Sequence, residues 1–247
     1  MFGTLLGSFL NVCVYRLPRK ESIVWPRSYC IHCKSTIPLW YNIPIISYIL
    51  LRGKCRFCKS RIPYLYPLLE LLTGALLVLV WLHYGLTASF VHYSVLILLL
   101  LPISFIDLNH KLILNVLTFP GIVIGLLLGM LTNETWMLQG IFGTIAGGGF
   151  LWLIGLFGKV LFKQESMGGG DIKLAAMVGT FIGPQVLIAL FLAFFLALPV
   201  VVLGLVNGRI RPGSTLPFGP FISLATVVVV CFGQSLYEFY LDFMGYI

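Results

Sequence analysis

The sequence predicts an all-α polytopic membrane protein with about eight transmembrane helices and a small cytoplasmic domain inserted between helices 1 and 2. Three observations lead to this prediction. Hydrophobic residues make up 59% of the 247 residues and charged residues only 10%, whereas soluble domains carry about 25% charged residues. The apolar residues form runs close to the roughly 20 residues that a transmembrane helix needs. The basic residues gather in one segment that also holds four of the six cysteines.

The spans are placed by the apolar runs and by the polar breaks between them. We expect helices near residues 1–15, 65–83, 91–107, 112–131, 137–158, 172–183, 185–206 and 216–234. The first is short, because it would rise only about 22 Å and the hydrocarbon core is about 30 Å thick. A signal peptide is the alternative there, but the basic residues follow the apolar run instead of preceding it. The segment 172–183 is also short and follows three glycines, so we expect a partial or broken helix.

Lys and Arg occur only in alternate breaks, and this pattern predicts the orientation of the spans. The basic residues fall in four groups: Arg16 to Arg61, Lys111, Lys159 to Lys173, and Arg209 to Arg211. By the positive-inside rule these breaks face the cytoplasm and both termini lie outside. Ten of the 16 basic residues fall in the first group, beside a single acid, Glu21. The net charge of +8 therefore reflects membrane orientation, and we expect no nucleic-acid partner.

The inserted segment contains two C-x2-C pairs 21 residues apart, formed by Cys30, Cys33, Cys55 and Cys58. Each pair can present two thiolates from one tight turn, and two pairs complete the tetrahedral sulfur shell of a structural zinc ion. The cytoplasm is reducing, so a metal is favoured over disulfides. The alternatives are unbound thiols and a thioredoxin-like site, although no βαβ pattern surrounds either pair. We expect three parts: a first transmembrane helix at 1–16, a four-cysteine zinc-binding domain at 17–64 and a membrane-embedded domain at 65–247.

Two aspartates lie where predicted spans meet the cytoplasmic face. Asp107 ends an apolar run, and Asp171 closes the glycine-rich segment 167–171. An ionised carboxylate at membrane depth is costly, so such residues are expected to face a wet cavity with a functional role. In a like-charged pair, one carboxyl keeps its proton while the other acts as a base. Such a pair can deprotonate a water that attacks a peptide carbonyl and can then protonate the leaving amine.

The glycines before Asp171 support the same candidate site. Gly168 and Gly170 leave the neighbourhood of the carboxylate free of side chains, so a substrate backbone can approach closely. The simpler alternative is that each aspartate only caps or flanks a helix. We interpret Lys173 as an inner-face anchor. The role of Glu70, near the start of the second span, stays open between pairing with basic residues and lining the same cavity.

Six sequence elements, in order along the chain, resemble those of the bacterial prepilin peptidases, which are type IV leader peptidases. They are Gly7 to Val12 with Tyr15 to Pro18, the two C-x2-C pairs, Asn42 to Tyr48, Tyr66-Pro67 with Glu70, Ile106-Asp107 with Gly168 to Asp171, and Pro217 to Pro220. The G-x-G-D element alone also occurs in presenilin-like proteases. Six elements in one order are far more specific.

The resemblance implies a bifunctional aspartic endopeptidase and N-methyltransferase of the bacterial inner membrane. Members cut the leader from prepilins and pseudopilins after a glycine, on the cytoplasmic side, and then methylate the new N-terminus with S-adenosylmethionine. It implies that Asp107 and Asp171 form the protease pair and that the four cysteines bind Zn²⁺. The substrates would be partners in the membrane, in type IV pilus or type II secretion systems. The sequence carries no nucleotide-binding fingerprint of the soluble type that would locate the methyl-donor site.

One departure and two alternatives accompany this resemblance. After the first aspartate the family usually has Pro followed by Asp or Asn, whereas this chain has Leu114-Asn115, which affects the helix geometry expected near Asp107. One alternative is a membrane transporter or proton-relay protein, in which Asp107 and Asp171 carry ions and the zinc loop docks a partner. The other is a G-x-G-D protease that does not methylate its product.

Overall fold

A computed structural model describes residues 1–132, 134–162, 167–208 and 216–243. The basic residues Lys163, Arg209 and Arg211, which contribute to the predicted orientation, lie outside the described residues. The described part is helical and forms no strand, and its β-structure is limited to two isolated bridges, Tyr29 with Thr36 and Lys54 with Arg61.

A helix lies at each of the eight ranges expected from the sequence. The α-helices are α1 (Phe2–Arg16), α2 (Ile46–Leu50), α3 (Leu65–Tyr84), α4 (Ala88–His110), α5 (Asn115–Thr132), α6 (Glu134–Phe162), α7 (Gly169–Ile182), α8 (Val186–Val206) and α9 (Gly219–Phe243). Short 3-10 helices lie at η1 (Leu17–Arg19), η2 (Leu39–Tyr41) and η3 (Gly183–Gln185). The short helix α2, within the four-cysteine segment, was not expected.

Five stretches of the described chain are long and apolar enough to cross a membrane. They are Leu65–Tyr84, Ala88–His110, Asn115–Thr132, Thr135–Leu161 and Gly169–Val206. The last stretch contains both α7 and α8, which meet at η3, where Gly183 has a positive φ of 59°. Helix α1 has 15 residues, and the described side chains of α9 form a shorter apolar stretch, Gly219–Gly233. The fold is therefore that of a polytopic membrane protein, and the count of eight spans stays a prediction.

The chain divides into two compact units, Met1–Leu82 and His83–Ile247. In the first unit, small residues bring α1 and α3 close together. A side chain at Gly7 would meet the Cα atom of Glu70 at 2.7 Å, and one at Gly74 would meet the Thr4 methyl group at 2.8 Å. Contacts between small residues are the usual way in which membrane helices approach closely.

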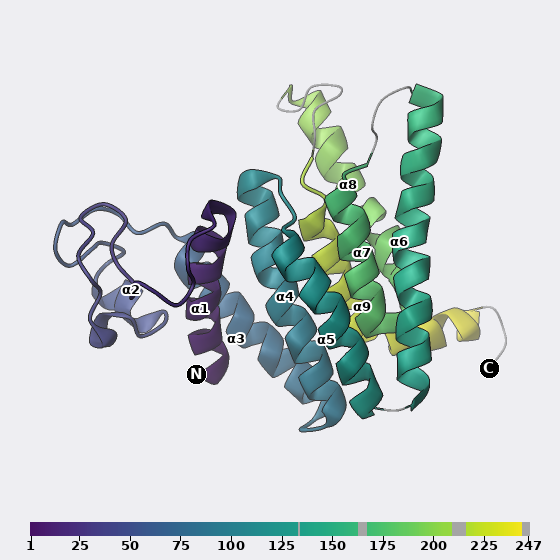
Figure 1. Cartoon of the computed structure of the whole chain (residues 1–247), viewed down its shortest axis with the longest axis horizontal. Helices are drawn as coiled ribbons and strands as arrows, with labels where there is room; N and C mark the ends of the chain where they lie inside the picture. Colours follow the sequence, from purple (N-terminus) through teal and green to yellow (C-terminus); the bar gives the residue numbers. More distant parts are fainter. Residues whose placement is uncertain (133, 163–166, 209–215, 244–247) are drawn as a thin grey trace. The chain divides into compact units, whose positions relative to one another are not determined.

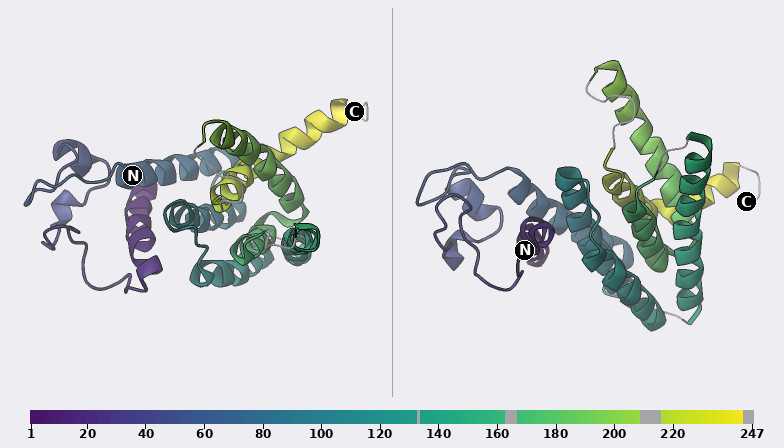
Figure 2. Two further views of the ribbon diagram at one scale, coloured as in Figure 1. Left: turned by 90° about the horizontal axis from the view of Figure 1, so that it is seen from above. Right: turned by 45° about the horizontal axis from the view of Figure 1, so that its top comes forward.

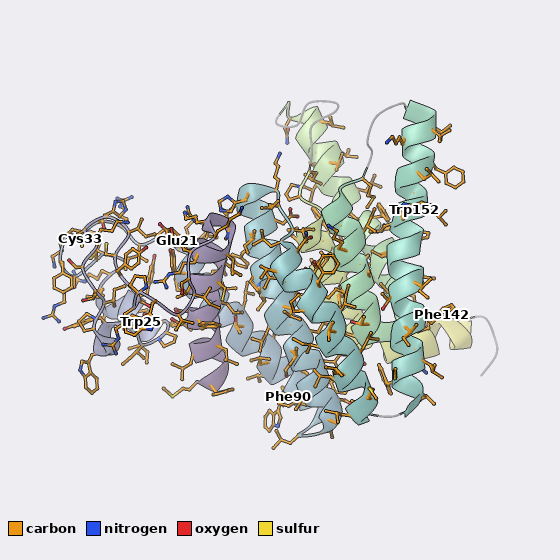
Figure 3. The ribbon with its side chains drawn as sticks, in the orientation of Figure 1. Glu21, Trp25, Cys33, Phe90, Phe142 and Trp152 are labelled. Atoms are coloured by element: carbon orange, nitrogen blue, oxygen red, sulfur yellow. The ribbon has the colours of Figure 1, made fainter. Side chains whose placement is uncertain are left out.

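The second unit is a helix bundle with α7 at its centre. Figures 1 and 2 show α7 alongside α5 and α6, and it also packs against α4, α8 and α9. From Leu174 to Ile182 almost every side chain of α7 is buried. Glycines make this packing possible: a side chain at Gly147 of α6 would lie 2.7 Å from the Ala175 carbonyl oxygen. By contrast, Phe142 and Trp152, labelled on α6 in Figure 3, are exposed, as expected for a surface that faces lipid.

Candidate functional site

The four cysteines of the first unit form one cluster. Their four Sγ atoms all lie within 4.8 Å of one another, and the Sγ atoms of Cys30 and Cys58 are 3.8 Å apart. Zinc–sulfur bonds of about 2.3 Å in a tetrahedral shell place neighbouring sulfur atoms about 3.8 Å apart. The cluster is therefore compact enough to hold a zinc ion. Figure 3 labels Cys33 in the loop that carries the cluster.

The two cysteine pairs are presented by matching turns. In the first, the Cys30 N–H donates to the Ser35 carbonyl and the Lys34 N–H donates to the Cys30 carbonyl, both at 2.9 Å. In the second turn the Cys55 N–H donates to Ser60 at 2.8 Å and the Lys59 N–H to Cys55 at 3.0 Å. Lys34 and Lys59 both have a φ of 58°. Each C-x2-C pair is thus held in the same tight conformation by local hydrogen bonds.

The surroundings of Cys58, the exposed cysteine of the cluster, favour its thiolate form. The hydroxyl and backbone N–H of Ser60 lower the pKa of Cys58 to about 6, so this exposed thiol is largely ionised at neutral pH. The pKa of Cys55 is raised, because the lowering effect of the Cys58 N–H is outweighed by burial and by the thiols of Cys30 and Cys58. Metal ligation requires thiolates, so Cys58 is already suited to that role.

In the second unit, Asp107 lies in the last turn of α4. The helix begins at an N-cap, Thr87, whose side chain accepts from the Phe90 N–H at 3.3 Å, and it continues beyond Asp107 to His110. The aspartate is only 4% exposed. Its Oδ2 accepts a hydrogen bond of 2.9 Å from the backbone N–H of Gly219, the first residue of α9. Asp107 is therefore held at the N-terminus of a second helix.

Asp171 lies within the first turn of α7. The sequence placed it just before the short span, but the helix begins earlier, at Gly169, with Gly168 as its N-cap. The carboxylate turns back and accepts a hydrogen bond from the backbone of Gly168. This is the position from which an acidic side chain commonly caps its own helix. Both aspartates thus contact the N-terminus of a helix, as the capping alternative from the sequence expected.

The structure brings the two aspartates together. Their carboxylates lie close enough to interact electrostatically, and the helices that carry them, α4 and α7, pack against each other. Each carboxylate also faces a helix N-terminus, where unpaired N–H groups carry a partial positive charge. These helix ends offset part of the repulsion between the buried Asp107 carboxylate and the half-buried Asp171 carboxylate. Two like-charged carboxyls that interact in this way disfavour ionisation of both at once.

The three glycines before Asp171 have different surroundings. A side chain at Gly168 would lie 2.9 Å from the Asp171 Oδ2, and one at Gly170 would lie 2.9 Å from the Cβ atom of Ile113. At Gly169 a side chain would meet nothing within 4 Å. Only Gly168 and Gly170, the two positions singled out from the sequence, thus need to be small.

Two other charged residues considered from the sequence, Lys173 and Glu70, do not belong to the aspartate pair. The Lys173 Nζ donates a 2.9 Å hydrogen bond to the Asn115 Oδ1 at an exposed position, next to the departure at Leu114-Asn115. Glu70 belongs to the first unit, and its carboxylate accepts a 2.8 Å bond from the Ile45 N–H.

Sequence reasoning missed the contact between Gly219 and Asp107. The Pro217 to Pro220 segment was noted as an element of the resemblance, but nothing in it indicated a bond to the aspartate.

Comparison with known proteins gives a consistent result along the chain. Residues 1–84 match a model described as the bacterial peptidase A24 N-terminal domain, and residues 94–203 match the type IV leader peptidase family. A prepilin leader peptidase/N-methyltransferase of Pseudomonas aeruginosa is 34% identical over 100% of this chain and 93% of its own length. Proteins of the same name from Neisseria gonorrhoeae and Aeromonas hydrophila are 31% and 33% identical over 96% and 98% of this chain, and over 91% and 92% of their own. No solved structure matches the chain.

Proposed function

This chain belongs to the type IV leader peptidase family, and we propose that it is a membrane aspartic endopeptidase and N-methyltransferase. It cuts the leader peptide from prepilins or pseudopilins after a glycine and then methylates the new N-terminus. The observation that carries the peptidase assignment is the electrostatic interaction between Asp107 and Asp171, which lie at the N-termini of α9 and α7. Relatives that match along the full length carry both activities in their name.

In the proposed peptidase step the two carboxyls share one proton. The ionised carboxyl removes a proton from water, and the water oxygen bonds to the carbon of the scissile peptide. The protonated partner donates to the carbonyl oxygen, and the C–N bond then breaks as the departing amine takes up a proton. The proton belongs to the coupled pair, so neither Asp107 nor Asp171 is assigned a fixed protonation state. Gly168 keeps the space beside Asp171 open for the substrate backbone, and Gly170 lets the start of α7 pack against Ile113.

In the proposed methyl transfer, the amine released by cleavage is the nucleophile. S-adenosylmethionine supplies an electrophilic methyl group. The neutral amine nitrogen bonds to the methyl carbon, and the carbon–sulfur bond breaks with its electron pair left on sulfur. The nitrogen then loses one proton to solvent. Atoms and charge balance without an oxidant or a metal.

We propose that Cys30, Cys33, Cys55 and Cys58 hold a structural zinc ion. The distances between their sulfur atoms and the matching turns support this assignment. Bound zinc supplies folding energy to a loop that has little core of its own. Among the described residues, the segment 17–64 contains only 3-10 turns and α2 as regular structure. In this proposal the cysteines stabilise the fold of the loop through the bound metal.

We also propose the finer topology. The protein lies in the bacterial inner membrane with about eight spans, and the four-cysteine segment 17–64 faces the cytoplasm between the spans at 1–16 and 65–84. The concentration of basic residues in that segment supports the orientation. The membrane-embedded domain at 65–247 then carries both aspartates on its cytoplasmic side, where a prepilin anchored by its apolar segment presents its leader. Pilus and type II secretion systems supply such substrates.

A single assay tests the function. Purified protein in detergent is incubated with a prepilin-like peptide and S-adenosylmethionine, and the masses of the products are measured by mass spectrometry. We expect a cleaved product that is one methyl group heavier than the bare peptide. A cleaved product without the added methyl would leave only the peptidase, and an uncut peptide would favour the transporter or proton-relay alternative.

A further inference from the structure

The first unit contains a cavity that the peptidase chemistry does not use. Its volume is about 250 Å³, and all the residues that line it fall within Met1–Leu82. Its wall comes from α1, from the four-cysteine segment and from the start of α3, which contribute Ser8, Asn11, Ser47, Tyr48, Tyr66 and Glu70. These residues belong to three of the sequence elements noted above, none of which the aspartate pair explains. Three segments that are distant in sequence therefore line the same cavity.

Buried polar groups line this cavity. Asn11, Ser47 and Glu70 are between 7% and 9% exposed. The Glu70 carboxylate accepts the Ile45 N–H at 2.8 Å, and the side chains of Ser8 and Asn11 interact with it, while the Asn11 Nδ2 donates to the Tyr66 carbonyl at 3.0 Å. Among the lining residues that the structure describes, Glu70 is the only acidic one. Burying a carboxylate is costly, so a carboxylate fixed at the edge of a cavity is well placed to bind a positively charged ligand.

Aromatic side chains form much of the remaining wall. Tyr48 and Tyr66 line it from two different segments, and Tyr15, Tyr29 and Tyr41 add further rings. Three of these rings already carry a guanidinium over one face: Arg19 over Tyr15, Arg16 over Tyr29 and Arg56 over Tyr41. Aromatic faces stack on flat bases and attract cations. The wall also holds Arg16, Arg56 and Arg61 beside the Glu70 carboxylate, so it suits a ligand that combines a purine base with both a positive charge and a carboxylate.

We propose that this cavity binds the methyl donor S-adenosylmethionine, with Glu70 facing its sulfonium group and the tyrosines surrounding its adenine. The inference rests on the methyl transfer proposed above, and it adds the site. The volume of about 250 Å³ lies just below the range of small-molecule sites, about 300–1,000 Å³. Because the cavity opens to the surface, part of the donor would remain at its mouth.

Equilibrium binding to the full chain in detergent tests the role of Glu70. S-adenosylhomocysteine has the same base and amino acid as the donor but a neutral sulfur, so it separates charge recognition from fit. For Glu70→Gln we expect S-adenosylmethionine to bind at least about tenfold more weakly and S-adenosylhomocysteine to change less than about threefold. Glu21→Gln is the matched control, because Glu21 is an exposed acid of the same unit outside the cavity. It should bind both ligands as the wild type does.

Photo-crosslinking of radiolabelled S-adenosylmethionine to the wild type tests the position of the site without any substitution. We expect the label within Met1–Leu82, on peptides that line the cavity. Label confined to His83–Ile247, or equal weakening of the two ligands by Glu70→Gln, would overturn the inference. If the wild type methylates its product but Glu70→Gln binds the donor normally, the proposed site is wrong. The proposed methyl transfer then still stands. A wild type that neither binds the donor nor methylates would overturn both the site and the proposed methyl transfer.

Discussion

Asp107 and Gly219 are 112 residues apart in the chain, yet the backbone N–H of Gly219 donates a 2.9 Å hydrogen bond to the Asp107 Oδ2. The bond joins the last turn of α4 to the first residue of α9. It depends on the missing side chain, because a Cβ atom at position 219 would lie 2.8 Å from the same oxygen. The position of one proposed catalytic carboxylate is therefore set by a glycine far away in the sequence.

Gly219→Ala should displace the Asp107 carboxylate. A misplacement of about 1 Å can cost roughly 100-fold in rate, so we expect a large loss of cleavage with the fold retained. Gly149→Ala is the matched control, because Gly149 is also helical and a side chain there meets nothing within 4 Å. Initial rates of leader cleavage by the two variants give the comparison. Equal activity of both variants would show that the contact with Gly219 does not position Asp107.

The three adjacent glycines before Asp171 offer a second matched series. Gly168→Ala and Gly170→Ala should each reduce cleavage at least about tenfold, because their new methyl groups meet Asp171 and Ile113. Gly169→Ala should remain active, since its methyl group points into open space. Cleavage rates measured alongside thermal unfolding separate catalytic loss from instability. A series in which Gly169→Ala is the most damaged variant would contradict this geometry.

Zinc removal should unfold the four-cysteine segment while leaving the helical bundle intact. Cys30→Ser, or treatment with a chelator, removes one ligand or the metal, and the loop then loses the folding energy that binding supplies. Metal analysis should find one zinc per wild-type chain, and circular dichroism should show that most helix persists. Cys13→Ser is the control, because Cys13 is a buried residue of α1 outside the cluster. Native protein with no zinc and four reactive thiols would refute the assignment.

Lys173→Gln should change cleavage less than about fivefold. Its exposed hydrogen bond to Asn115 resembles surface contacts worth about 0–1 kcal/mol. Cleavage rates at saturating peptide provide the measurement, with Asn115→Ala as the partner variant. A loss as large as that of an aspartate variant would give Lys173 a part in catalysis and would refute its assignment as an anchor.

Local patterns allowed the helices and the cysteine cluster to be predicted. Apolar runs placed a helix at each expected range because burial in lipid requires continuous hydrophobic segments. The C-x2-C spacing predicted the cluster because each pair forms within a single turn. The ends of the helices were predicted less accurately than their positions. Helix α4 extends to His110 and α7 begins at Gly169, so both aspartates lie inside helices.

Contacts over long sequence distances could not be predicted in the same way. No periodicity links Gly219 to Asp107 or brings Ile45 to Glu70, since both contacts depend on how whole helices and loops pack. The cavity of the first unit went unpredicted for the same reason. It is assembled from three separated segments, and its polar residues are each unremarkable within their own segment.

The most direct test of the central claim is leader cleavage by Asp107→Asn and Asp171→Asn, read by product mass. Each substitution keeps the size of the side chain but removes the titratable proton, so we predict a loss of at least about 100-fold in each. Glu21→Gln provides a carboxyl-to-amide control at an exposed acid of the first unit and should still cut. Cleavage at the wild-type rate by either aspartate variant would contradict the account.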